Sequence, residues 1–410
     1  MSGKDIQSIS AVLLLALLLR LAWAVMIPVV PISDSAAYEA FARTLAEHGV
    51  YGWTPDHPSA YWPVGTSAMY AALFSLFGYS YLPIVALNIA LSTLIVCLTI
   101  WLGRILFDQN TALLAGALMA VWPSQIAFVT VLASEVPFTF FILLGSCAWL
   151  SQRSSNSIRV SVSGLAFGAA TYIRPIAILL PVVLWLSLVP HWRMLWRQIP
   201  VLVLSMVVIG VTIAPWSVRN TLLFDRFVLV STNGGVNFWM GNNPDADGFY
   251  MKTPAYTHGL NEYERDRVLG DAAKQYILAE PLAFVMRTVK KAMLLHAGET
   301  IAIGWNSEGI KQRLGEGALF PLKLLTQGFW TIALVLSLIG LAILARERGL
   351  LPSLVNPVAM TWMFFTAVYA ITVVQDRYHF PSHPLIAMLA AIAILTTAKR
   401  MQKRSSGDRA

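Results

Sequence analysis

Ten apolar runs divide the 410-residue sequence, and they constrain its fold more than any other feature. A helix needs about 20 apolar residues to cross the hydrocarbon layer of a membrane. The sequence therefore predicts an all-α polytopic membrane protein with about ten transmembrane helices, forming a single integral domain over 1–410. The runs lie near residues 9–30, 81–103, 111–128, 136–150, 160–173, 176–190, 199–217, 320–345, 353–374 and 382–398.

The scarcity of charge supports the same class. Only 12% of the residues are charged and 57% are hydrophobic, whereas soluble domains carry about 25% charged residues. This composition excludes soluble, disordered and collagen-like proteins. The two cysteines, Cys97 and Cys147, lie in apolar runs, which excludes a disulfide-rich secreted scaffold.

The positive residues indicate an orientation, because Lys and Arg accumulate in short cytoplasmic connections. With the N-terminus inside, the basic tail at 399–410 and most basic residues of the short connections fall on the cytoplasmic side. We therefore expect both termini in the cytoplasm and a location in a bacterial inner membrane. The net charge of +8 then needs no nucleic-acid partner. The first run also resembles a signal peptide, but its length and Arg20 favour an uncleaved anchor.

Two longer segments, 31–80 and 218–319, are expected on the outer face. The first should contain a short amphipathic helix that stops at Gly49, followed by an apolar helix at the interface over 63–78. The second should contain a Gly/Asn-rich turn region and two helices, one charged near 261–279 and one basic and amphipathic near 281–298.

Ionisable residues near the membrane are the candidates for chemistry. Only Arg20 lies near the middle of a run, and transporters normally place such groups there. The acids outside the long loop gather at the outer rim instead, together with arginines that suit a phosphate because Arg binds it bidentately and keeps its charge. The acids are Asp34, Glu39, Glu47, Asp56, Glu135 and Asp376, and the arginines are Arg174, Arg219 and Arg377.

Each of these candidates has a structural alternative. The arginines could extend to the interface and meet lipid headgroups. Asp34 could be the N-cap of the helix that follows it, in competition with Ser33 and Ser35. Glu135 could only mark the turn between two helices, and the aromatic residues of the outer loops could form an interfacial belt or stack on a sugar.

Histidines are the other candidate ligands. We find no pair with the spacing of metal ligands on one helix. No metal site is therefore predicted and no cofactor is required, although a divalent metal is left open. The histidines concerned are His57, His258, His379 and His383.

Several segments, taken in order, resemble membrane glycosyltransferases of the C-type fold, including the protein O-mannosyltransferases and the lipid A aminoarabinose transferases. The segments are SDSAAYEAFARTLAEHGVYG, HPSAYWPVGTSAMYAALFSLFG, LASEVPFTFF, TYIRPIAILLP, RNTLLFDRFVLVSTNGGVNFWMGNNP and DRYHFPSHPLIAMLAA.

The resemblance implies an integral enzyme that moves a sugar from a polyprenyl-phosphate donor to a hydroxyl of a glycan, lipid or protein at the outer face, with inversion. It maps an essential acid of the first outer loop onto Asp34, as general base or orienting group, and a second acid onto Glu135. The departing phosphate is expected at Arg174, Arg219 and Arg377. Contacts to the sugar or acceptor are expected from Tyr38, His57, Tyr61, Trp62, Asn237 and Tyr378.

One motif departs from the aminoarabinose transferases. They have Glu-Lys-Pro-Pro in the first loop, where this chain has Tyr61-Trp62-Pro63-Val64-Gly65. The rival hypotheses are a multi-pass transporter or lipid-carrier flippase, for which Arg20 would be essential, and a non-catalytic membrane scaffold.

Overall fold

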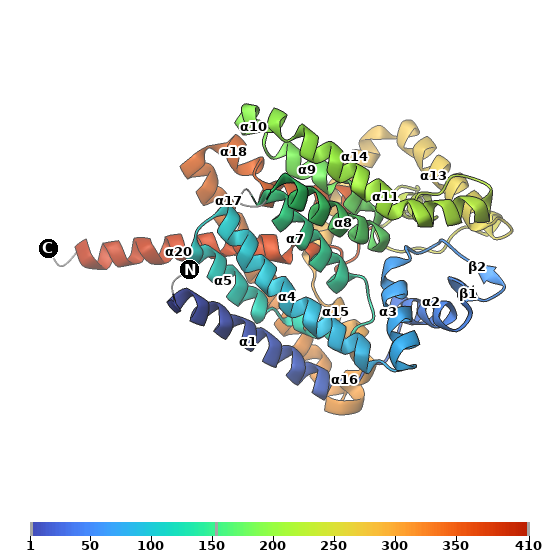
Figure 1. The fold of residues 1–410 in the computed structure, drawn as a ribbon, viewed down its shortest axis with the longest axis horizontal. Helices are drawn as coiled ribbons and strands as arrows, with labels where there is room; N and C mark the ends of the chain where they lie inside the picture. The colour runs from blue at the N-terminus through green and yellow to red at the C-terminus, as the bar shows by residue number, and fades with distance from the viewer. Residues whose placement is uncertain (1–2, 152–154, 408–410) are drawn as a thin grey trace.

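A computed structural model describes residues 3–151 and 155–407, and helices make up most of this part of the chain (Figure 1). The all-α expectation needs one small correction, because β1 (Gly52–Thr54) and β2 (His57–Pro58) pair as an antiparallel hairpin. Residues 152–154, with Arg153, and the last three residues of the predicted basic tail lie outside the described ranges.

Five helical stretches of the described chain are long and apolar enough to span a membrane. Two bent pairs raise the number to seven if each pair is one span. An integral membrane protein is therefore confirmed, whereas the count of ten stays a prediction. The five are α1 (Gly3–Met26), α4 (Leu82–Leu106), α11 (Ile199–Phe224), η5 with α17 (Glu316–Ala318 and Leu319–Arg348), and η6 with α20 (Phe380–Ser382 and His383–Gly407).

The remaining predicted runs form shorter or bent helices. The run at 111–128 bends by 54° and the run at 176–190 by 45°. Their elements are α5 (Gln109–Ala120), α6 (Pro123–Ala127) and η1 (Phe128–Thr130), then η2 (Pro175–Leu179), α9 (Leu180–Leu186), η3 (Val189–His191) and α10 (Trp192–Arg197). The shorter helices are α7 (Glu135–Leu150), α8 (Asn156–Ile173), α18 (Leu350–Leu354) and α19 (Pro357–Ile371).

Arg20 stabilises the bend between α5 and α6. Proline has no N–H, so Pro123 leaves the carbonyl of Met119 without its helical donor. The guanidinium of Arg20 donates to the carbonyl oxygens of Met119 at 3.3 Å and Ala120 at 3.0 Å, and to Ser92 Oγ at 2.7 Å. The one ionisable residue expected near mid-membrane is therefore used to hold a helix end.

The first predicted outer segment has the expected helices. α2 (Asp34–His48) ends at Gly49, which has φ 70° and donates its N–H to the Leu45 carbonyl at 3.0 Å. A positive φ favours glycine, so the predicted stop is confirmed. α3 (Gly65–Phe77) follows the hairpin within the predicted apolar stretch.

The second segment contains both predicted helices and several that were not expected. α13 (Glu262–Ala279) begins with a capping box made by Asn261 and Glu264, and α14 (Pro281–Ala297) follows. The Gly/Asn-rich region, predicted as turns, contains a two-turn helix. The unexpected elements are α12 (Gly234–Met240), η4 (Ala255–Thr257), α15 (Ile301–Trp305) and α16 (Ser307–Leu314).

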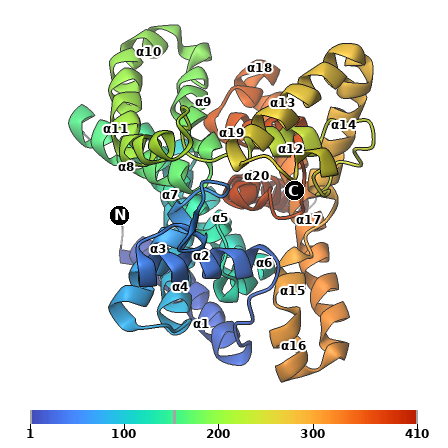
Figure 2. The ribbon, with the colours of Figure 1, turned by 90° about the vertical axis from the view of Figure 1, so that its right-hand side faces the viewer.

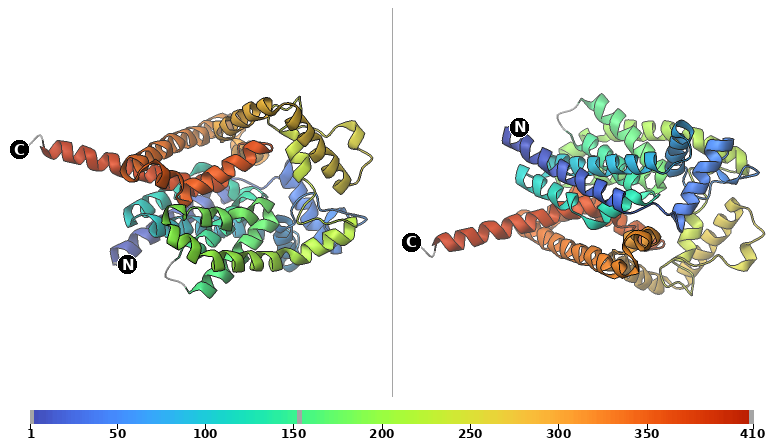
Figure 3. Two further views of the ribbon diagram at one scale, coloured as in Figure 1. Left: turned by 90° about the horizontal axis from the view of Figure 1, so that it is seen from above. Right: turned by 90° about the horizontal axis from the view of Figure 1, so that it is seen from below.

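The two segments lie at one end of the molecule. In Figure 1, α2, α3, the hairpin and α13 lie together on the right, while both termini lie on the left. Figure 2 views the molecule from that right-hand end, and Figure 3 shows the C-terminal part of α20 projecting from the opposite end. The helices between the two ends pack closely: a Cβ on Gly340 of α17 would lie 2.0 Å from the Leu389 carbonyl oxygen of α20.

Candidate functional site

Asp34 is the first residue of α2, and its carboxylate is part of an ion pair. Arg377 donates from Nη2 to Asp34 Oδ2. The preceding Ser33 occupies the N-cap position without a side-chain capping bond, and it has φ 52°, which is unusual for a residue with a side chain. The alternative of Asp34 as an N-cap is therefore not supported.

Arg377 joins the two predicted catalytic acids through one guanidinium. Its Nη2 contacts Asp34, and its Nη1 donates to Glu135 Oε1 at 3.1 Å. Its Nε donates to Gln375 Oε1 at 2.6 Å, and its plane lies over the ring of Trp305, 4.4 Å from the centroid. All three kinds of guanidinium nitrogen are thus used, which fixes the orientation of the group.

Glu135 and Arg174 form the inner half of the same cluster. The buried Glu135 begins α7, and Arg174 follows the last residue of α8. Arg174 Nη2 donates to Glu135 Oε1 at 2.5 Å and to Ser134 Oγ at 2.9 Å, while Nη1 donates to the Tyr369 hydroxyl at 2.9 Å. Glu135 is therefore an ion-pair partner and more than a boundary marker.

The charges of this cluster balance. Two carboxylates and two guanidiniums give a formal net charge of zero. Burial lowers the pKa of Arg377, but the carboxylates of Glu135 and Asp34 outweigh burial and the pKa is raised. Burial also lowers the pKa of Arg174, and Tyr369 and Glu135 outweigh it in the same way. Both arginines therefore keep their positive charge inside a largely buried site.

A cavity of about 380 Å³ opens beside the ion pairs. Asp34, Arg174 and Arg377 line it, so charged groups of both signs reach its interior. Most of the predicted sugar and acceptor contacts line it too, and they supply aromatic and amide surface. These residues are Tyr38, Tyr61, Trp62, Asn237 and Tyr378.

Three predicted site residues do not line the cavity: Glu135, which is buried behind it in the ion-pair cluster, Arg219 and His57. Arg219 donates to the carbonyl oxygens of Ser59 at 2.7 Å and Tyr51 at 3.4 Å, so it attaches the first outer segment to α11. His57 is exposed on the hairpin and forms a hydrogen bond with Thr54. The structure brings neither Arg219 nor His57 into the cluster of Asp34, Glu135, Arg174 and Arg377.

Sequence reasoning missed Asp266, which also lines the cavity. It lies on α13 and accepts hydrogen bonds from the backbone N–H groups of Gly235 at 2.6 Å and Val236 at 3.1 Å. Burial raises its pKa despite these bonds. In the sequence Asp266 is one acid among several in a charged helix, so no signal distinguishes it. Gln375 and Tyr250 also line the cavity and were missed, because nothing in the sequence marks either residue as part of a site.

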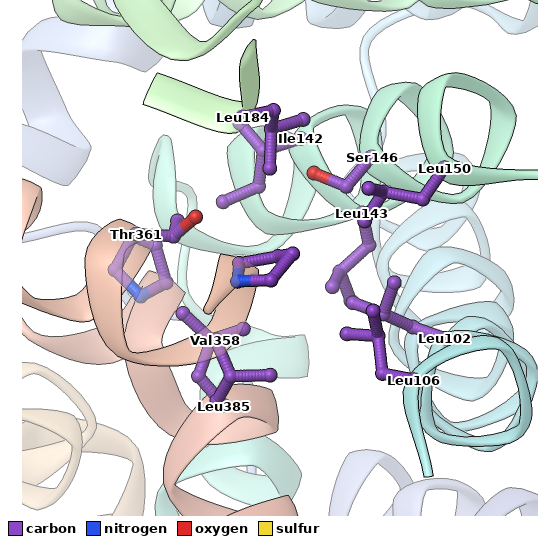
Figure 4. A pocket seen from close by; sticks show the side chains of 12 residues that line it. Leu102, Leu106, Ile142, Leu143, Ser146, Leu150, Leu184, Val358, Thr361 and Leu385 are labelled. Carbon is purple, nitrogen blue, oxygen red and sulfur yellow. The ribbon is translucent and has the colours of Figure 1, made fainter. Parts of the chain in front are cut away.

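A second hollow, drawn in Figure 4, has a different character. Its volume is about 10 Å³, and its walls are mainly hydrocarbon from residues such as Leu102, Ile142 and Leu385. No ionisable side chain lines it, so it is a packing gap.

One group of the described residues could hold a metal ion. Glu299, His379 and His383 are buried and place one potential ligand atom each within 4.8 Å of one another. The structure thus brings together a candidate ligand set that the search for a histidine pair on one helix did not find. His379 lies just before η6 and His383 begins α20 four residues later, and their side chains approach the same point.

Comparison with known proteins supports the predicted family. Residues 56–218 match the family described as dolichyl-phosphate-mannose-protein mannosyltransferase. The predicted family resemblance is confirmed. The matched stretch contains Glu135 and Arg174, whereas Asp34 and Arg377 lie outside it. No curated protein matches the sequence.

Solved structures of an archaeal oligosaccharyltransferase share the fold. The oligosaccharyltransferase of Archaeoglobus fulgidus, tethered to an acceptor peptide, aligns with TM-score 0.56 and 11% identity over 97% of this chain and 50% of its own. The archaeal oligosaccharyltransferase AglB from Archaeoglobus fulgidus, in complex with an inhibitory peptide and a dolichol-phosphate, aligns with TM-score 0.55 and 13% identity over 100% of this chain and 52% of its own. The chain thus spans about half the length of these enzymes. ArnT from Cupriavidus metallidurans, bound to undecaprenyl phosphate, aligns with TM-score 0.45 and 17% identity over 96% and 78%.

Proposed function

We propose that the protein is a glycosyltransferase that moves a sugar from a polyprenyl-phosphate donor to an acceptor hydroxyl. The observation that carries this proposal is the pairing of Asp34 with Arg377 at the wall of the 380 Å³ cavity. A carboxylate can accept the proton of a hydroxyl, and a guanidinium can bind a phosphate. The reaction needs both groups next to the same bond. The family match and the dolichol-phosphate bound to the archaeal relative support the class of donor.

In the proposed reaction, Arg174 and Arg377 hold the phosphate of the donor. Both are charged, and both line the cavity with Tyr38, Tyr61 and Trp62, whose rings offer a surface for a sugar. As the bond between the anomeric carbon and the phosphate oxygen breaks, that oxygen takes the electron pair. The two guanidiniums then stabilise the negative charge that develops on the phosphate.

Asp34 acts as the base toward the acceptor. The acceptor oxygen attacks the anomeric carbon from the side opposite the phosphate, and its proton passes to the Asp34 carboxylate, which inverts the anomeric centre. Arg377 contacts Asp34 before substrate arrives. A donor phosphate competes for the same N–H groups, so donor binding weakens the ion pair and releases the carboxylate for the acceptor.

The membrane orientation belongs to the same proposal. Segments 31–80 and 218–319 form the outer face, both termini are cytoplasmic, and the ten apolar runs cross or enter a bacterial inner membrane. Support comes from the placement of α2, α3 and α13 at the end of the molecule opposite both termini (Figure 1).

The transporter hypothesis loses its main candidate. It needs a functional polar group at mid-membrane, but Arg20 is buried and its guanidinium donates to Ser92 and to carbonyls of α1 and α5. These contacts explain Arg20 as a structural residue.

Two linked measurements test the proposal. Depleting the protein in its own cells should cause a lipid-linked sugar to accumulate, and mass spectrometry of the lipid extract identifies it. Purified protein in vesicles should then consume that lipid and release free polyprenyl phosphate when membrane extract supplies the acceptor. Unchanged lipid-linked sugars after depletion would contradict the proposal.

A further inference from the structure

Three buried polar side chains meet at a point that the proposed reaction does not use. Glu299 lies between α14 and α15, His379 precedes η6, and His383 begins α20. Their exposed fractions are 3%, 1% and 0%. One nitrogen or oxygen atom of each lies within 4.8 Å of the other two.

His379 has a nitrogen that is free to bind. Its Nδ1 lies 2.7 Å from the carbonyl oxygen of Leu295. A carbonyl only accepts, so Nδ1 carries the proton and the neutral ring has a lone pair at Nε2. That Nε2 is buried and has no hydrogen-bond partner among the described residues. The ring is also held in place by Trp330, whose centroid lies 4.0 Å away at an interplanar angle of 13°.

One carboxylate oxygen of Glu299 accepts two hydrogen bonds. Trp122 Nε1 donates to Oε1 at 2.9 Å, and the hydroxyl of Ser124 donates to the same oxygen. Oε2 has no partner in the described part of the chain.

His383 can present its Nε2 in the same way. Its Nδ1 lies 3.1 Å from the side-chain amide of Gln125, whose Oε1 has no partner. With this amide rotated by half a turn, Oε1 accepts the proton of Nδ1, and the lone pair is left on Nε2, which lies 3.3 Å from Glu299 Oε1. An Nδ1–H that donates to a carbonyl or amide oxygen is the usual support of a metal-binding histidine.

We propose that Glu299, His379 and His383 bind a divalent transition-metal ion such as zinc. Two imidazoles and one carboxylate are a common protein ligand set for zinc. Glu299 Oε2, His379 Nε2 and His383 Nε2 are each buried without a hydrogen-bond partner in the described part of the chain, and an unpartnered buried polar atom is destabilising. Zinc lies about 2.0–2.2 Å from nitrogen and oxygen ligands, so a small contraction of the group completes the contacts.

The ion would also position a residue of the cavity. His379 lies two residues after Arg377, and Glu299 is attached to α6 through Trp122 and Ser124. Coordination therefore joins α6 and the α14–α15 connection to the start of α20. This fixes the backbone that carries Arg377, whatever reaction the cavity supports.

Metal analysis of the purified full-length protein tests the proposal. After incubation with zinc sulfate and dialysis, the wild type should retain about one zinc per chain. The isosteric Glu299→Gln keeps the contacts with Trp122 and Ser124. This variant and His379→Asn should each retain at least 10-fold less zinc per chain than the wild type.

His296→Gln is the matched control, because His296 stacks near His379 at 6.0 Å but is not one of the three ligands. It should retain zinc like the wild type. Cobalt loading should give a visible absorption band in the wild type and in His296→Gln, and none in Glu299→Gln. A wild type that retains no zinc, or a Glu299→Gln variant that retains as much as His296→Gln, would overturn the proposal. The histidines would then be part of an aromatic stack in the core.

Discussion

At the residue scale, Arg377 is the centre of the proposed site. It contacts Asp34 on the cavity side and Glu135 on the buried side, while Arg174 completes the set. A lysine has one ammonium group and could not hold both carboxylates in fixed directions. The arrangement thus explains why a chain so poor in charge places four charged residues together.

The buried half of this cluster should contribute strongly to stability. Glu135→Gln leaves Arg174 and Arg377 without a buried counter-charge, and breaking a buried pair costs about 3–5 kcal/mol. We expect a large fall in the unfolding temperature in detergent. The control is Asp271→Asn, which breaks the exposed pair with Lys274 and should cost less than about 1 kcal/mol. Equal shifts for the two variants would contradict the account.

Charge scarcity predicted the members of the cluster but not their partners. Asp34, Glu135, Arg174 and Arg377 are conspicuous because so few charges lie near the membrane rim. The same reasoning selected Arg219, which instead binds backbone carbonyls of the first outer segment. Sequence alone could not distinguish the two cases, because the direction of a long side chain depends on which segments pack beside it.

At the element scale, the helices and their ends follow local chemistry. Gly49 ends α2 as predicted, and Asn261 caps the start of α13, a position that asparagine favours. The bends were harder to predict. Hydropathy averages over a run and gives one span over 111–128, whereas Pro123 divides it and Arg20, a hundred residues away, stabilises the break.

The close contact between α17 and α20 depends on Gly340, which has no side chain. Gly340→Ala would place its Cβ against the Leu389 carbonyl, so the two helices must move apart. Overpacking of this kind costs about 1–3 kcal/mol. Gly328→Ala, on the same helix, meets nothing within 4 Å and should be neutral or slightly stabilising.

Unfolding temperatures of the two alanine variants in detergent measure this difference. If Gly328→Ala were the more destabilised of the two, the packing of α17 on α20 described above would be wrong.

At the scale of the whole molecule, the order of apolar runs predicted the class of fold, whereas the cavity emerges only from packing. Its wall combines α2, the connection after α8, α12, α13 and the segment before α20. These elements are far apart in the sequence, so no local pattern could show that Asp266 or Gln375 would join Asp34.

The proposed topology can be tested with single cysteines. Asp56→Cys, on the exposed hairpin, should react in intact cells with a maleimide that does not cross membranes. Glu347→Cys, exposed near the end of α17, should react only after the membrane is permeabilised. The wild type gives the background from Cys97, which is partly buried, and Cys147, which is buried. Labelling of both variants in intact cells would contradict the orientation.

The central claim is that Asp34 receives the acceptor proton, and the transfer rate of Asp34→Asn in reconstituted membranes tests it most directly. A general base contributes about 10²–10⁴-fold to a rate, so Asp34→Asn should lose at least about 100-fold, while Asp56→Asn in the same segment keeps the wild-type rate. Both variants should elute like the wild type in gel filtration. A correctly folded Asp34→Asn that transfers sugar as fast as Asp56→Asn would contradict the account.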